Sequence, residues 1–174
     1  MTYLKVMKRS TSGSAEKSSS TAGALTDLVI EIFRLNGVLL AAGDALVRDL
    51  GLTSARWQVL GAIALSPTPL PVAHIARNMG LTRQAVQRVV DDMRADNLLQ
   101  LEPNPHHRRA MLVTMTESGE AAYDQASKLQ QRWVGNLALG LSADTIEAAR
   151  ALLQTLQQRV ESALTPVKSA TQED

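Results

Sequence analysis

Apolar residues recur every three or four positions along most of the chain, and this spacing predicts amphipathic α-helices. The longest run covers 24–50, and two more cover about 116–139 and 142–164. Between them the pattern is shorter and predicts helices at about 53–65, 71–79 and 82–97. The apolar positions of the first run are Leu25, Leu28, Ile32, Leu35, Leu39, Ala42 and Leu46.

Two short runs after the third short helix do not fit a helix. LLQLE and MLVTMT show partial alternation of apolar and polar residues, and PNPHHRRA separates them. Because prolines exclude helix in that separating segment, we predict a β-hairpin here. The chain should therefore be mostly α-helical, with one hairpin between four helices and two.

The segment IARNMGLTRQAVQRVV places a glycine between two of the short helices. A residue in the left-handed region gives the steep turn of a helix-turn-helix, and glycine adopts it without a side-chain penalty. We expect the turn at 80–82, with Leu81 folding into the core. Ala76 should face the second helix, and the small core between the two helices should contain Ile75, Met79, Leu81, Val86 and Val89.

Arginine and glutamine residues crowd the second helix of this pair. Residues 74–90 contain three arginines and no acid, the charge bias that contact with phosphates needs. An ordinary amphipathic helical hairpin would explain the apolar spacing but would leave these polar residues as accidental surface. We expect Thr82 to cap the helix beside the DNA, Arg83, Gln84 and Gln87 to read bases, and Arg88 to contact a base or a phosphate.

The hairpin would convert this unit into a winged helix. Its loop carries Arg108 and Arg109 beside His107, and a wing arginine suits the minor groove or its flanking phosphates. Alternatively, one arginine pairs with Asp91 or Asp92 and braces the wing. We expect one of the two arginines to brace the wing and the other to contact DNA.

At this point the chain resembles the MarR (multiple antibiotic resistance regulator) family of bacterial transcription factors. The resemblance lies in LTSARWQVLGAI, then VAHIARNMGLTRQAVQRVVDDMRADNLLQ, then PHHRRAMLVTMTESG, and the helix order extends it over 24–165. It implies a homodimer that binds a pseudo-palindromic operator and is released by a small, often aromatic or anionic, ligand. Gln87 and Arg88 match the family's Ser/Thr-Arg pair, and Arg109 matches the last arginine of the wing motif.

The wing departs from the family pattern, which often reads Asp-Pro-x-Asp-Arg-Arg. Asn104 and His107 stand where the two acids would be, so the geometry of the wing can differ. The adjacent His106 and His107 suggest a pH-dependent affinity for DNA, because histidine ordinarily titrates near pH 6.5.

The long helices also predict self-association, because their apolar faces exceed what one small lobe can cover. The expected organisation is a mostly α fold with a winged helix-turn-helix lobe at 51–116. Dimerisation helices at 24–50 and 117–165 would flank the lobe, and disordered tails would occupy 1–23 and 166–174. The first tail is rich in Ser and Gly and carries four basic residues against one acid in its first 20 positions.

A ligand pocket is considered near Arg56 and Trp57, with Trp133 approaching it, although we favour Trp57 as an ordinary core residue. We predict no metal site, because the chain has no cysteine and His74 should lie far from the wing histidines. No cofactor is implied.

The chain has no Gly-rich phosphate loop and no nucleophile elbow, so we do not expect an enzyme. With neither an apolar run of membrane-spanning length nor a signal peptide, we expect a cytoplasmic, nucleoid-associated bacterial protein. Two functions remain: a repressor that binds double-stranded DNA and responds to a ligand, and a winged-helix module that docks protein without binding DNA. The arginines and glutamines of the second helix favour the first.

Overall fold

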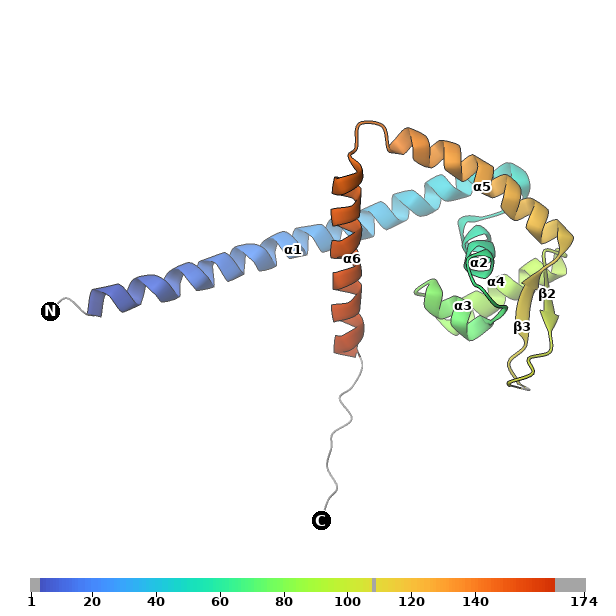
Figure 1. Ribbon diagram of the computed structural model, residues 1–174, viewed down its shortest axis with the longest axis horizontal. Helices are drawn as coiled ribbons and strands as arrows, with labels where there is room; N and C mark the ends of the chain where they lie inside the picture. Colours follow the sequence, from blue (N-terminus) through green and yellow to red (C-terminus); the bar gives the residue numbers. More distant parts are fainter. Residues whose placement is uncertain (1–3, 108, 165–174) are drawn as a thin grey trace, which may run out of the picture. The chain divides into compact units, whose positions relative to one another are not determined.

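The computed structural model of the chain describes residues 4–107 and 109–164, with side chains from residue 20 onward. Figure 1 shows a mostly helical chain with one small sheet, as the sequence predicts. Its contacts group into two compact units, 1–130 and 131–174. In chain order the elements are α1 (Leu4–Val47), η1 (Arg48–Leu50), α2 (Ser54–Ala64), β1 (Leu70–Pro71), α3 (Val72–Asn78), α4 (Arg83–Ala95), β2 (Leu99–Glu102), β3 (Leu112–Met115), α5 (Glu117–Leu137) and α6 (Ala143–Leu164).

The first helix begins earlier than the sequence pattern predicts. It starts at Leu4, whereas the Ser/Gly-rich segment up to residue 23 was expected to be disordered. Disorder was expected because this segment has little apolar surface to bury. However, the chain has no proline before residue 67 that would interrupt a helix. Nothing in the local sequence therefore stops the helix from extending toward the N-terminus.

The sheet has one more strand than the expected hairpin. β2 and β3 pair antiparallel, with Leu99 opposite Met115, which confirms the hairpin. The additional strand, β1, pairs with β3 through Leu70 and Pro71, giving the order β1-β3-β2. Pro71 was expected in the first turn of the following helix but lies in this edge strand. Proline is tolerated there because its missing N–H does not remove a hydrogen bond from the middle of the sheet.

One hydrophobic core holds the lobe together. It lies among α2, α3, α4 and the sheet, and it also takes in one residue each from α1 and α5. Its fully buried members alternate with exposed polar residues at helical spacing, which is why α4 presents a polar face outward. The largest fully buried side chains are Leu60, Ile75, Met93, Val47, Val59, Val86, Val90 and Val113.

The expected helix-turn-helix is present between α3 and α4. Gly80 has φ +64°, the left-handed conformation that the turn requires. The Leu81 N–H donates to the Ala76 carbonyl at 2.9 Å, and the Thr82 hydroxyl caps α4 by accepting the Ala85 N–H at 3.2 Å. Ile75, Ala76 and Val86 are buried between the helices as predicted, and Met79 and Val89 pack against them half-buried.

The prediction for Leu81 was wrong, because its side chain is 47% exposed. The turn is closed by the backbone hydrogen bond from its N–H, so the Leu81 side chain is not needed in the core. This places an apolar residue on the surface directly beside the first turn of α4.

Candidate nucleic-acid interface

The outward face of α4 gathers the polar residues that the sequence singled out. Val86, Val90 and Met93 are fully buried on one side of this helix. The polar residues of its first two turns point away from the core: Arg83, Gln84 and Arg88 are exposed and Gln87 is half-buried. The first turn of α4 contains no acid, so the partial positive charge of the helix N-terminus adds to that of Arg83.

Gln87 is oriented by a partner on its own helix. Its side-chain N–H donates to Asp91 Oδ1 at 3.0 Å, and Arg94 Nη1 lies 3.7 Å from the same oxygen. The carbonyl oxygen of the Gln87 amide and its second N–H remain available to a partner. Asp91 is thus engaged within α4, with Gln87 and Arg94.

Two side-chain acceptors shape the tip of the wing. Asn104 Oδ1 accepts the N–H of His106 at 2.9 Å, and His107 Nδ1 accepts the N–H of Arg109 at 3.3 Å. Both are local turns in which a side chain bonds the backbone two residues on. Asn104 and His107, which replace the acids of the wing pattern, therefore still act as acceptors but bring no negative charge.

The structure describes only one of the two wing arginines. Arg109 is exposed, and within the described part of the chain the ion pairs belong to Arg34, Arg56, Arg94 and Arg150, so Arg109 has none. Arg108 lies outside the described residues. The predicted arrangement, with one arginine bracing and one contacting DNA, stays a prediction.

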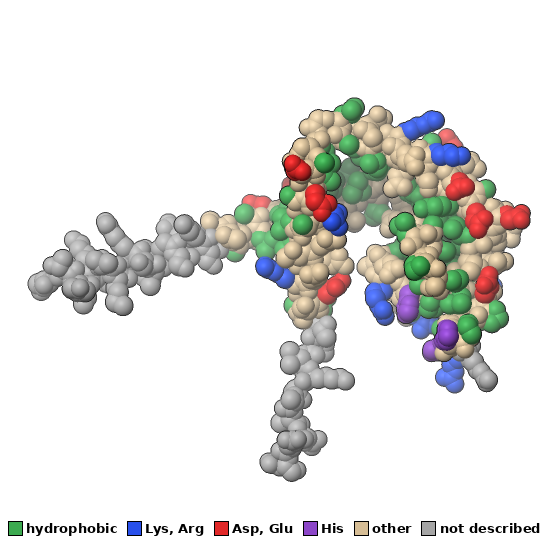
Figure 2. All heavy atoms as spheres, in the orientation of Figure 1, with side chains coloured by type: hydrophobic (Ala, Val, Ile, Leu, Met, Phe, Trp, Pro, Cys, Tyr) green, Lys and Arg blue, Asp and Glu red, His purple; other side chains and the backbone are tan. Residues whose placement is uncertain are grey.

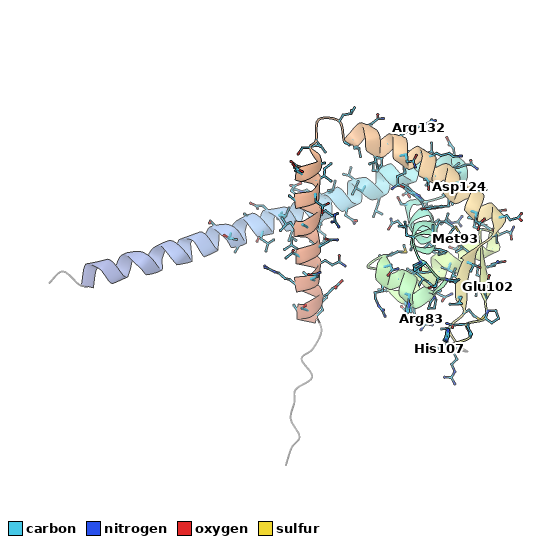
Figure 3. All side chains as sticks on the ribbon, in the orientation of Figure 1. Arg83, Met93, Glu102, His107, Asp124 and Arg132 are labelled. Atoms are coloured by element: carbon cyan, nitrogen blue, oxygen red, sulfur yellow. The ribbon has the colours of Figure 1, made fainter. Side chains whose placement is uncertain are left out.

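A groove of about 1140 Å³ runs between the wing loop, the start of α3 and the start of α4, and we call it the wing groove. Figure 3 shows Arg83 and His107 at the same end of the lobe, and Figure 2 shows histidine and basic side chains gathered there. Among the described residues, those lining the groove include no Asp or Glu. Its charged and polar lining comes from Thr68, His74, Arg83, Gln87, Asn104, His106, His107 and Arg109.

His74 is the residue whose position the sequence analysis missed. It was expected to be remote from the wing, yet it lines the wing groove together with His106 and His107. The reason is β1: the pairing of Pro71 with Leu112 anchors the start of α3 at the base of the wing. A two-residue strand leaves no periodicity in the sequence, so no pattern pointed to this contact. The described residues contain no group of three His, Asp or Glu side chains placed to hold a metal ion.

The residues proposed for a ligand pocket have structural partners. Arg56 Nη1 lies 2.7 Å from Asp96 Oδ2, so this guanidinium ties α2 to the end of α4. Trp57 is half-buried against the core, which agrees with its interpretation as a core residue. Trp133 is half-buried on α5 and belongs to the second unit. Their role in ligand binding stays a prediction.

The lobe is similar in sequence to known proteins. A sequence model of the MarR family matches residues 50–110. An uncharacterised protein of Mycobacterium tuberculosis is 41% identical over 92 residues, which are 53% of this chain and 63% of that protein. The transcriptional activatory protein BadR of Rhodopseudomonas palustris is 31% identical over 100 residues, covering 56% of this chain and 57% of BadR. The chain thus spans less than two thirds of the length of these relatives.

Solved structures agree with this fold. The M. tuberculosis regulator MosR in complex with DNA superposes with a TM-score of 0.65 at 23% identity, covering 76% of this chain and 94% of MosR. CouR of Rhodococcus jostii RHA1 bound to p-coumaroyl-CoA gives 0.64 at 23% identity, covering 78% of this chain and 91% of CouR. Within the described residues no helix is both long and apolar enough to cross a membrane.

Proposed function

This chain carries a MarR-family winged helix, and from that premise we propose that the protein is a DNA-binding transcriptional regulator that acts as a homodimer. The observation that carries the proposal is the outward face of α4 over residues 83–88, which is basic and amide-rich, while the opposite face of the helix is buried. The wing groove continues this surface without a lining acid. Phosphate contacts supply affinity and amide or guanidinium contacts to base edges supply specificity, and this surface offers both.

The contacts divide between the major groove and the backbone. Arg83, Gln84 and Gln87 stand at the start of α4, the end that a recognition helix presents to base edges. Arg88, one turn further along, binds a base or a phosphate. Thr82 caps the helix next to these contacts. On the wing, Arg109 and His107 contact the minor groove or its phosphates. We assign the same role to Arg108.

Unpaired apolar surface supports the homodimer. α1 and α6 each expose a series of large apolar side chains, and α6 buries no residue at all. Exposed apolar stretches of this length need a covering partner, and a second copy of the chain is the simplest one. These residues are Leu25, Val29, Ile30, Phe33, Leu35, Val38, Leu39 and Leu40 on α1, and Ile146, Leu152, Leu153, Val160 and Leu164 on α6.

The dimer fits the geometry of a pseudo-palindromic operator. Two recognition helices related by a two-fold axis read half-sites about 34 Å apart, which is one turn of DNA. In this scheme 24–50 and 117–165 serve dimerisation and 51–116 serves DNA binding. The protein would work in the bacterial cytoplasm and would need no catalytic chemistry.

We further propose that a small ligand regulates DNA binding. CouR was solved with p-coumaroyl-CoA, an aromatic and anionic molecule, and its fold is shared by this chain. We favour a repressor that such a ligand releases, with Trp57 and Trp133 as aromatic contacts. A ligand carboxylate could use Arg56 only in competition with Asp96. The relative BadR is an activatory protein, so the sign of regulation needs a direct reporter measurement.

Selection of duplexes from a random-sequence pool by the full-length protein tests the DNA-binding role. A regulator should enrich a two-fold symmetric site, and its affinity for that site should fall steeply as salt rises. A protein-docking module would enrich no sequence and would show no salt-dependent binding to the pool.

A further inference from the structure

His74, Arg83 and the wing residues reach the wing groove from three separate elements. His74 stands in the first turn of α3, Arg83 opens α4, and His106 and Arg109 belong to the loop between β2 and β3. All four side chains are exposed. A groove with nitrogen donors on three sides suits a ligand that carries negative charge along its length.

The acids closest to this surface in sequence are engaged elsewhere. Asp91 bonds Gln87 and pairs with Arg94, and Glu102 accepts the Thr114 hydroxyl at 2.9 Å. At the wing tip, Asn104 holds the turn with an amide oxygen. A carboxylate at position 104 could hold the same turn, but it would place a negative charge in the groove. The lining therefore carries less negative charge than an acidic wing tip would, and this favours a polyanion as its ligand.

We propose that the wing groove seats one sugar-phosphate strand of the DNA duplex, and that His74 is a phosphate-binding residue there. This inference rests on the proposed function. A helix in the major groove and a wing in the adjacent minor groove have between them the strand that separates the two grooves. The wing groove occupies that position in the lobe, between Arg83 of α4 and the wing loop.

Protonation of His74 and His106 would strengthen their proposed contacts with the DNA phosphates. An imidazole donates one hydrogen bond when neutral, and two with a positive charge when protonated. Within the described residues the side chains of His74 and His106 have no hydrogen bond to lose. His107 differs, because protonation at Nδ1 breaks its bond with the Arg109 N–H. The other charged and titratable groups that line the groove with His74 are Arg83 from α4 and His106, His107 and Arg109 from the wing, and β1 contributes none.

His74→Gln tests the contact in the full-length protein, with the duplex selected from the random pool as the probe. Glutamine keeps one donor but cannot become charged. Near pH 6 the affinity should fall about threefold to tenfold, and the slope of log K against log salt should become shallower by about 0.9 per lost contact. The difference should shrink as the pH rises, because only the protonated imidazole carries a charge that glutamine cannot supply. An unchanged melting temperature excludes misfolding as the cause.

Asn104→Asp tests the charge of the groove with the turn preserved. The new carboxylate can still accept the His106 N–H, so the variant changes charge alone, and its affinity should fall about tenfold at low salt. Gln125→Glu, on the exposed face of α5 outside the groove, makes the same charge change and should bind within about twofold of the unaltered protein.

Two results would overturn the inference while leaving the proposed function intact. The first is a His74→Gln protein with unchanged affinity and salt slope near pH 6, and the second is equal binding by Asn104→Asp and Gln125→Glu. If the unaltered protein binds no duplex in a salt-dependent manner, the proposed function fails and this inference fails with it.

Discussion

The Ser54 side chain fills the space that a methyl group at Gly43 would occupy. The Ser54 hydroxyl donates to the Leu40 carbonyl at 2.9 Å, and the Ser54 N–H donates to Asp44 Oδ1 at 2.6 Å. A β-carbon at Gly43 would overlap the Ser54 hydroxyl and contact the Trp57 ring. The absence of a side chain at Gly43 is therefore what allows α1 to cap and clamp the start of α2.

Gly43→Ala should consequently destabilise the lobe although alanine favours helix. The clash should outweigh the propensity gain of about 1 kcal/mol and leave a net loss of about 1–3 kcal/mol. Thermal and urea unfolding followed by circular dichroism measure this difference. Gly61→Ala is the matched control, because a methyl group there meets no atom within 4 Å and should stabilise α2. Equal stability of the two variants would show that the clamp does not exist.

Gly80→Ala should weaken the turn between α3 and α4. A side chain at φ +64° costs about 1–2 kcal/mol, and no neighbouring atom lies close enough to cause a separate clash. Gly80→Asn should lose less, because asparagine tolerates the left-handed region. The comparison of melting temperatures isolates the backbone effect. A Gly80→Asn protein less stable than Gly80→Ala would contradict this account of the turn.

The apolar series on α6 should govern the oligomeric state. Replacing Leu152 and Leu153 together with glutamate places two charges on the face that a second copy is proposed to cover. We expect the dissociation constant of the dimer to increase at least tenfold, because burying an unpaired charge costs several kcal/mol. Sedimentation equilibrium measures this change, and far-UV circular dichroism checks that the helices persist.

Gln154→Glu with Gln158→Glu is the control for the α6 variant. It adds the same two charges to exposed polar positions of α6 and should leave the assembly unchanged. A single-copy protein in every case would refute the homodimer.

Features set by local chemistry could be predicted from the sequence. Gly80 and Thr82 delimit the turn and the start of α4, and both act as expected. The helical period places Val86 in the core and Val89 against it, and therefore Arg83 and Gln87 on the other side of the helix. Each of these inferences needs only neighbours within one or two helical turns.

Features set by contacts between distant segments could not be predicted. The strand β1 has two residues, so its pairing with β3 left no pattern, and the approach of His74 to the wing depends on it. Arg56 had no visible partner in sequence, because Asp96 lies 40 positions further along the chain. Leu81 was misjudged for another reason: an apolar residue in a turn need not be buried when its N–H already closes that turn.

Binding of the selected duplex by Arg88→Ala tests the central claim, that the outward face of α4 binds DNA, most directly. Arg132→Ala, which removes an exposed arginine from α5, is the control. We expect Arg88→Ala to bind at least tenfold more weakly, at unchanged melting temperature, while Arg132→Ala stays within about twofold of the unaltered protein. Equal affinity of Arg88→Ala and the unaltered protein would contradict the claim.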